Sequence, residues 1–186
     1  SLAHVLAKAV LRLYPEAKLT IGPAISDGFY YDFDVPTNFS QDDIKKIEKE
    51  MTSIINKNEK FERKVVGKEE ALELFKDNVY KQELINELPE NEEISLYYLG
   101  EDFVDLCRGP HVESTSKLQG YGFKIARING AYWRGSEKNK MLQRIYVYAF
   151  KDKKKLAEHI NMLEEAKKRD HNKLGRELEL FTTSDI

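Results

Sequence analysis

The spacing of apolar positions predicts a helix at the start of the chain. Apolar residues recur at helical intervals over residues 2–13, and Pro15 ends the pattern. His4 falls within this segment. Because the sequence starts inside a predicted helix and has no initiator methionine, we expect it to be part of a longer protein.

Short runs rich in aromatic and β-branched residues predict strands. Residues 19–25 and 28–35 flank the turn signal at Ser26 and Asp27, which predicts a hairpin. The same composition predicts further strands at residues 61–66, 94–100, 103–107, 123–128 and 142–150.

Helical patterns occupy the segments between these strands. Ser40 followed by Asp43 predicts a capped helix that continues to about residue 55. Shorter helices are predicted at 68–76 and 80–88, and a long charged connector helix at 151–169 stays helical to about Glu177. Strands and helices alternate irregularly, so the predicted fold class is α+β, a largely antiparallel sheet packed with helices. The predicted organisation is a domain at 1–150, a helical linker at 151–178, and the start of a further domain at 179–186.

Composition narrows the possible environments and partners. The 30 basic and 32 acidic residues nearly cancel, so any contact with RNA requires a local patch rather than a global field. Cys107 is the only cysteine, which excludes an internal disulfide and fits a reducing compartment. No stretch approaches the roughly 18 apolar residues of a membrane span, so we predict a cytoplasmic protein without a membrane partner.

The segment from Asp105 to His111 carries the densest candidate chemistry. Cys107 and His111 are four positions apart, at the end of a predicted strand and beside a Gly-Pro turn. A thiol and an imidazole at this spacing can share a metal, act as nucleophile and base, or hold a substrate between them. A buried small cysteine beside a surface histidine is the alternative, and the polar neighbours Asp105 and Arg108 argue against it.

Other candidates carry less information when taken alone. His4 gains importance only through partners, and Lys81 by its type is a solvated helix lysine. Tyr31 lies in a strand that has one packed face and one polar face. Arg134 follows two aromatic residues, a composition suited to stacking a nucleotide or anchoring phosphate, although a core tryptophan beside an exposed arginine is an equal alternative.

Taken together and in order, these motifs resemble the editing region of threonyl-tRNA synthetases. The resemblance covers essentially the whole chain. Its most specific element is the pairing of a histidine-containing first helix with DLCRGPH, about a hundred residues later. The related second additional domain of alanyl-tRNA synthetases and of freestanding editing proteins shares the histidine and Cys-His signature. It lacks the GRELELF segment, which resembles the start of a class II synthetase core.

The resemblance implies roles for particular residues. Its first helix carries two histidines four residues apart, of which His4 matches the second, and the first would stand immediately before Ser1. The predicted catalytic residues are His4, Lys81, Cys107 and His111, and the predicted substrate-binding residues are Asp105, Tyr31 and Arg134. No metal is expected in this site.

The resemblance also implies an activity, namely hydrolysis of seryl-tRNA(Thr) at the tRNA acceptor end. Serine lacks one methyl group of threonine, and one methyl group gives only about 10 to 200-fold discrimination, so a second site that destroys the smaller product is needed. The parent enzyme would attach threonine to tRNA(Thr) using ATP, with Mg and a Zn in its catalytic core, as a homodimer. This piece would contact the remaining synthetase domains, need no cofactor and perform no aminoacylation.

Two alternatives remain open from the sequence. An alanyl-type trans-editing domain would bind zinc, with His4, Cys107 and His111 as the candidate ligands. A passive tRNA-binding module would instead use the basic late helix and the aromatic-arginine segment 132–134.

Overall fold

A computed structural model describes residues 1–90 and 92–177 of the chain, with two antiparallel sheets and five α-helices in that range. The helices are α1 (Leu2–Leu13), α2 (Gln41–Asn56), α3 (Lys68–Leu74), α4 (Val79–Glu87) and α5 (Lys153–Glu177). The strands are β1 (Lys18–Leu19), β2 (Ala24–Ile25), β3 (Gly28–Asp34), β4 (Phe61–Val66), β5 (Ile94–Leu99), β6 (Val104–Leu106), β7 (Gly122–Tyr132) and β8 (Met141–Phe150). Short 3-10 turns are η1 (Thr115–Leu118) and η2 (Trp133–Gly135). The predicted α+β class is confirmed.

The larger sheet has the order β1-β3-β8-β7, with β2 also paired to β3, and the smaller one has the order β4-β5-β6. All pairings are antiparallel. The predicted strand at residues 19–25 forms as two short pieces, β1 and β2. Pro23 separates them, and its nitrogen has no hydrogen with which to continue a ladder.

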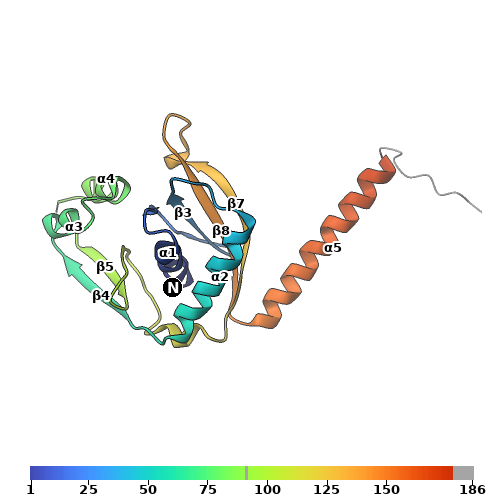
Figure 1. Ribbon diagram of the computed structural model, residues 1–186, viewed down its shortest axis with the longest axis horizontal. Coiled ribbons are helices and arrows are strands. Elements are labelled where there is room, and N and C mark those ends of the chain that lie inside the picture. The colour runs from blue at the N-terminus through green and yellow to red at the C-terminus, as the bar shows by residue number, and fades with distance from the viewer. Residues whose placement is uncertain (91, 178–186) are drawn as a thin grey trace, which may run out of the picture.

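Helix α1 lies between the two sheets and forms the centre of the molecule (Figure 1). Its residues Val5, Leu6 and Val10 have no exposed surface and pack into a core with residues of α2 and β3. The first helix is therefore held in place by the core that packs around it. The predicted capping of α2 is also confirmed, because the Ser40 and Asp43 side chains form a reciprocal capping box.

A buried lysine fastens α1 to the smaller sheet. Lys8 is 1% exposed, and its Nζ lies 2.7 Å from the Leu99 carbonyl, 2.5 Å from Glu59 and 2.6 Å from Asp102. Burial alone would raise the pKa of Asp102, but ion pairs with Arg12 and Lys8 lower it to about 2. These bonds fix the position of α1 along its axis, and with it the position of His4.

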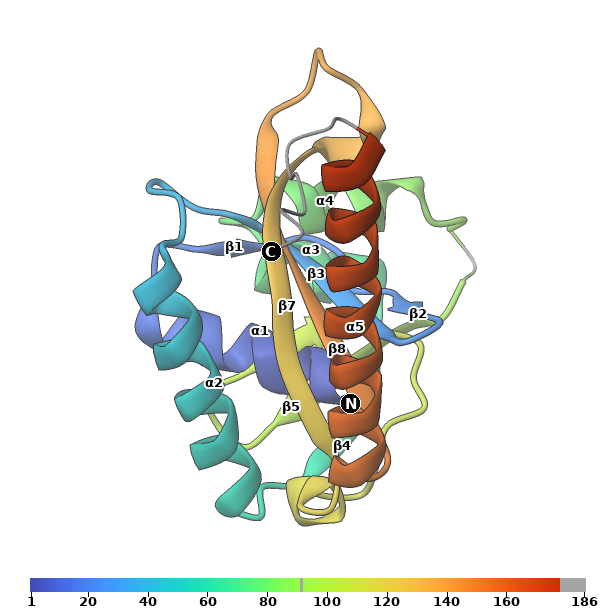
Figure 2. The same cartoon turned by 90° about the vertical axis from the view of Figure 1, so that its right-hand side faces the viewer.

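Helix α5 follows β8 and contacts both β7 and β8. It lies in front of the larger sheet in the view of Figure 2, and Figure 1 shows that it points away from the body toward its C-terminal end. His159 attaches it through ring contacts with Tyr148 and Phe150, at centroid distances of 4.9 and 5.0 Å. The prediction that the helix continues to about residue 177 is confirmed. The predicted further domain at 179–186 lies outside the described residues. None of the helices in the described ranges combines the length and apolarity that a membrane crossing requires.

Candidate functional site

The loop after β6 brings the thiol of Cys107 to the imidazole of His111. The Sγ to Nε2 distance is 3.2 Å, and the backbone N–H of Gly109 donates to the sulfur at 3.3 Å. Gly109 has a φ of +76°, and a Cβ on it would overlap the ring of Tyr97, so the turn requires glycine. The sequence prediction that these two side chains act together is therefore supported by their contact.

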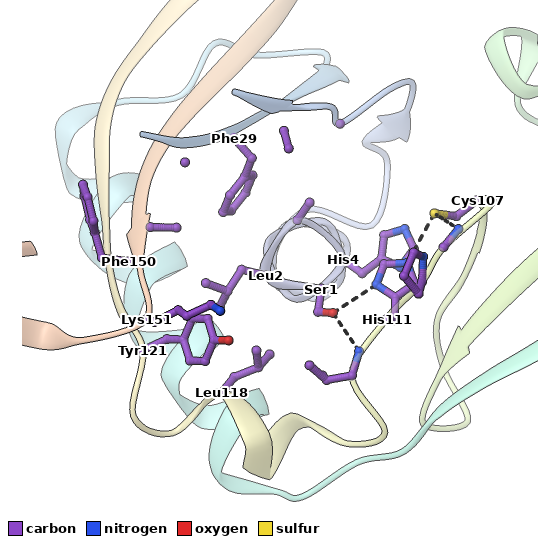
Figure 3. Close-up of a pocket in the computed structure, with 18 residues that line it drawn as sticks. Ser1, Leu2, His4, Phe29, Cys107, His111, Leu118, Tyr121, Phe150 and Lys151 are labelled. Carbon is purple, nitrogen blue, oxygen red and sulfur yellow. Dashed lines mark hydrogen bonds between the residues drawn. The ribbon is translucent and has the colours of Figure 1, made fainter. Parts of the chain in front are cut away.

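His4 joins this pair from α1. Its ring stacks on that of His111 with a centroid distance of 4.3 Å, and the side chain is buried. Its Nε2 lies 3.4 Å from an Asp105 oxygen, and its Nδ1 has no hydrogen-bond partner among the described residues. The first helix and the Cys-His loop thus meet in one site, as the resemblance implies (Figure 3).

Behind His4 lies a buried ion pair between Lys81 and Asp105, each 2% exposed and 2.5 Å apart. The Lys81 ammonium also donates to the Thr20 carbonyl at 2.7 Å, and the Tyr31 hydroxyl donates to Asp105 at 2.5 Å. The interpretation of Lys81 as a solvated helix lysine is therefore wrong. Lys81 is held because buried acceptors on β6 and on the β1–β2 segment surround it.

Burial and charge separate the protonation states of these groups. Burial lowers the pKa of His4, but interactions with Asp105 and Cys107 outweigh it, and the net pKa is raised. Burial, with the nearby His4 charge, lowers the pKa of His111 to about 3. The pKa of Asp105 is lowered, because the attraction of Lys81 and His4 exceeds the effect of burial. The site thus favours a proton on His4 more than water does, whereas His111 is neutral at pH 7.

The thiol responds to the same charges. Burial raises the pKa of Cys107, but the nearby His4 and the Gly109 N–H lower it further than burial raises it, so the net pKa is lowered. The sulfur is half-buried and adjoins the cavity. It can therefore line a binding site or act as a nucleophile.

A cavity of about 470 Å³ opens in front of these residues, within the range of small-molecule sites. Figure 3 shows His4, Cys107 and His111 grouped on one side of it. The other side carries three aromatic side chains and one cation, Phe29, Tyr121, Phe150 and Lys151. The cavity is thus polar where the reactive groups lie and largely aromatic opposite them.

Three side chains of the site can also hold a metal ion. Each of His4, Cys107 and His111 offers one ligand atom, and these three atoms all lie within 4.8 Å of one another. A tetrahedral zinc ion with bonds of about 2.0 to 2.3 Å separates its ligands by roughly 3.5 Å, so small side-chain shifts would close the set. Asp105 behind His4 matches the carboxylate that often orients a zinc-bound histidine. The residues present therefore fit a zinc ion with one open position.

Neither Tyr31 nor Arg134 lines the cavity. Tyr31 stands behind the site, where a Cβ on Gly22 would overlap its ring. Arg134 lies at the tip of the β7–β8 hairpin, pairs with Glu83 and Glu87, and is not among the residues that line the cavity. The structure therefore does not bring Arg134 to the other predicted site residues.

Sequence reasoning missed two residues that contribute to the site, Thr20 and Ser1. The Thr20 carbonyl accepts from Lys81, and no side-chain pattern marks a backbone acceptor. The Ser1 hydroxyl lies 3.2 Å from Nδ1 of His111 and accepts from the Val112 N–H at 3.0 Å. Ser1 is three positions before His4, a spacing that places both on one helix face and was a usable signal.

Comparison with known proteins shows which sequences this chain is similar to. Residues 94–146 match the family described as "Threonyl and Alanyl tRNA synthetase second additional domain", a segment that includes Asp105, Cys107 and His111. Over all 186 residues, the chain is 56% identical to "Threonine--tRNA ligase" proteins of Staphylococcus aureus strains JH9, Newman and Mu3. The chain spans 28% of the length of these relatives. These matches confirm the predicted resemblance to threonyl-tRNA synthetases.

Proposed function

We propose that this chain hydrolyses the ester between serine and the terminal ribose of tRNA(Thr). The observation that carries the proposal is the meeting of His4, Cys107 and His111 at one end of the cavity, with the Lys81–Asp105 pair directly behind. The reaction needs an oriented water, a group that takes its proton, and positive charge near the developing oxyanion. This site supplies candidates for each.

The protonation states suggest how the work is divided. His4, whose pKa is raised, lines the cavity and supplies positive charge for the oxyanion when it carries a proton, and Lys81 lies behind it. His111 is neutral, and its low pKa makes it a weak base. We therefore assign it to orienting the attacking water, and the proton that this water loses passes to the leaving ribose oxygen. Water attack on the ester carbon then breaks the bond to the ribose oxygen and releases serine.

Cys107 is assigned to the pocket wall in this proposal. Its lowered pKa and its contact with His111 also suit a covalent route, in which the thiolate attacks the ester carbon, the bond to the ribose oxygen breaks and that oxygen takes up a proton, and water then releases serine from the thioester. Cys107→Ala separates the two routes, because direct water attack does not require the thiol.

Serine would be selected by size. Threonine carries one methyl group more than serine, and a pocket that excludes this group discriminates by steric overlap. We propose that the cognate threonyl ester is spared for this reason. The tRNA acceptor end is the partner, and in the longer protein the remaining synthetase domains would attach threonine with ATP, Mg and a core Zn as a homodimer.

The test compares deacylation of seryl-tRNA(Thr) and threonyl-tRNA(Thr) by this chain and by a version extended upstream with the sequence of the Staphylococcus aureus relatives. We expect the extended version to release serine and spare threonine. A folded extended version that leaves the seryl ester intact, while a control editing enzyme cleaves it, would refute the proposal. Retained tRNA affinity in the same sample would favour the passive binding module.

A zinc site is the second candidate, because the three ligand atoms and Asp105 fit one. A bound zinc ion would supply a Lewis acid and a water of lowered pKa. We propose metal-free hydrolysis, since the Asp105 carboxylate is already paired with Lys81 and has less charge left to support a metal-bound His4. Elemental analysis of protein purified without chelator tests this, and stoichiometric zinc that EDTA removes together with the activity would reverse the choice.

A further inference from the structure

The tip of the β7–β8 hairpin packs on the helix that carries Lys81. Trp133 is 5% exposed, and its ring meets that of Tyr80 edge-on at a centroid distance of 5.1 Å. Leu84 and Leu142 complete this small apolar cluster, which is separate from the main core. The aromatic-arginine motif thus faces α4 and lies away from the cavity.

Polar contacts extend the same attachment. The Trp133 indole N–H donates to Glu83 at 2.9 Å, and Arg134 pairs with Glu83 at 3.1 Å and with Glu87 at 2.7 Å. Tyr80, Glu83 and Glu87 are spaced by three and four positions and so share one face of α4. Arg134 adopts a φ of +55°, a conformation rare for a side-chain-bearing residue, and these contacts hold it there.

Lys81 leaves the same helix one residue after Tyr80 and reaches Asp105 at 2.5 Å. Helix α4 has only nine residues, and a helix so short depends on tertiary contacts for its placement. Its N-terminus is fixed by Asn78, whose side-chain N–H donates to the Leu19 carbonyl at 2.8 Å. Ile85 anchors the opposite side of α4 in the apolar cluster beside β5, and the hairpin tip holds the face that contains Tyr80, Glu83 and Glu87. The hairpin tip is therefore one of the supports that set where the flexible Lys81 stem begins.

We propose that Trp133, together with Arg134 and Glu83, positions Lys81 against Asp105 for the reaction of this site. The inference rests on the proposed hydrolysis, in which Lys81 stabilises developing charge. Trp133 and Arg134 are positioning residues, since they touch neither the cavity nor the reactive side chains. A misplacement of about 1 Å in a reacting group can cost about 100-fold in rate, so a distant contact can control this step.

The first test is a cycle of substitutions measured by single-turnover hydrolysis of the seryl ester. We expect Trp133→Ala to lower the rate at saturating substrate at least about tenfold with little change in KM. Trp133→Phe keeps the ring on Tyr80 and should restore most of the rate. In a Lys81→Met background, Trp133→Ala should cause no further loss, because the residue would act through Lys81. Lys138→Ala, in the exposed turn of the same hairpin, is the matched control.

The second test does not depend on hydrolysis. Acetylation of lysine amines by acetic anhydride, quantified by peptide mass spectrometry, reports the access of reagent to Lys81, which is 2% exposed. We expect Trp133→Ala to increase the labelling of Lys81 several-fold while Lys8, 1% exposed in α1, stays protected. If Lys8 is also labelled, the variant has unfolded, and Trp133→Phe combined with Glu83→Gln takes its place.

Two results would overturn the inference. Unchanged Lys81 labelling in a folded Trp133 variant would show that the hairpin does not place the lysine. An equal rate loss in the presence and absence of Lys81 would show that Trp133 acts elsewhere. If the unsubstituted chain, extended upstream, cleaves no seryl ester, the proposed function fails, and the labelling alone then decides whether the hairpin positions Lys81.

Discussion

Replacement of Lys81 by methionine tests whether the buried ion pair behind His4 exists as described. Removing one partner of a buried pair costs about 3 to 5 kcal/mol, because it leaves an uncompensated charge. Asp105 would keep the Tyr31 hydroxyl and the Leu106 N–H as donors, at 2.5 and 2.8 Å. These donors place the expected loss near the lower end, at about 3 kcal/mol of unfolding free energy.

Urea unfolding at pH 7 measures this loss, with the slope m expected to stay unchanged. A domain of this size loses about 2 to 4 °C in Tm per kcal/mol, so the expected decrease is about 6 to 12 °C. Lys64→Met is the matched control, since Lys64 pairs with Glu70 at 2.6 Å but both side chains are more than half exposed. We expect that control to change stability by about 0.5 kcal/mol or less.

The reasoning fails if Lys81→Met costs under about 1 kcal/mol, the value for exposed pairs. Such a result would mean that Lys81 and Asp105 are solvated in the folded protein. A lower m for the variant would instead indicate a change in the compactness of one of the two states, and the comparison would then rest on hydrogen exchange of α4.

Three further outcomes are expected. Asp102, whose folded pKa of about 2 lies below the unfolded value, contributes stability that is present above about pH 4 and lost as the pH falls toward 2. Urea unfolding of Asp102→Asn should therefore show a smaller decrease over that interval. Gly22→Ala should cost about 1 to 3 kcal/mol by thermal unfolding, because its Cβ would overlap Tyr31, whereas Gly67→Ala, with nothing within 4 Å, should not. Cys107→Ala should slow seryl-ester hydrolysis about tenfold if water attacks directly, and a loss beyond about 1,000-fold would indicate the thiol route.

Local chemistry predicted much of the fold. The capped helix after Ser40 forms as expected because a capping box depends only on residues three positions apart. The contact between Cys107 and His111 was also accessible, since both lie in one short loop beside a glycine turn. Such features need no knowledge of distant segments.

The buried position of Lys81 could not be predicted from residues close to it in the sequence. Lysine in a polar helix is solvated by default, and burial here depends on acceptors at Thr20 and Asp105 that are far away in the sequence. Arg134 shows the converse case, because its composition suited a phosphate contact while its actual partners, Glu83 and Glu87, lie on a helix about fifty residues earlier. Only the resemblance to threonyl-tRNA synthetases predicted that His4 lies beside the Cys-His loop.

The stack of His4 on His111 joins the first helix to a loop 107 positions later in the chain. Closing so long a segment has an entropic cost that only a nearly complete core can offset. A partly folded molecule in which α1 has not docked would lack His4 beside the Cys-His loop. The proposed ester cleavage would therefore be confined to molecules in which α1 has docked.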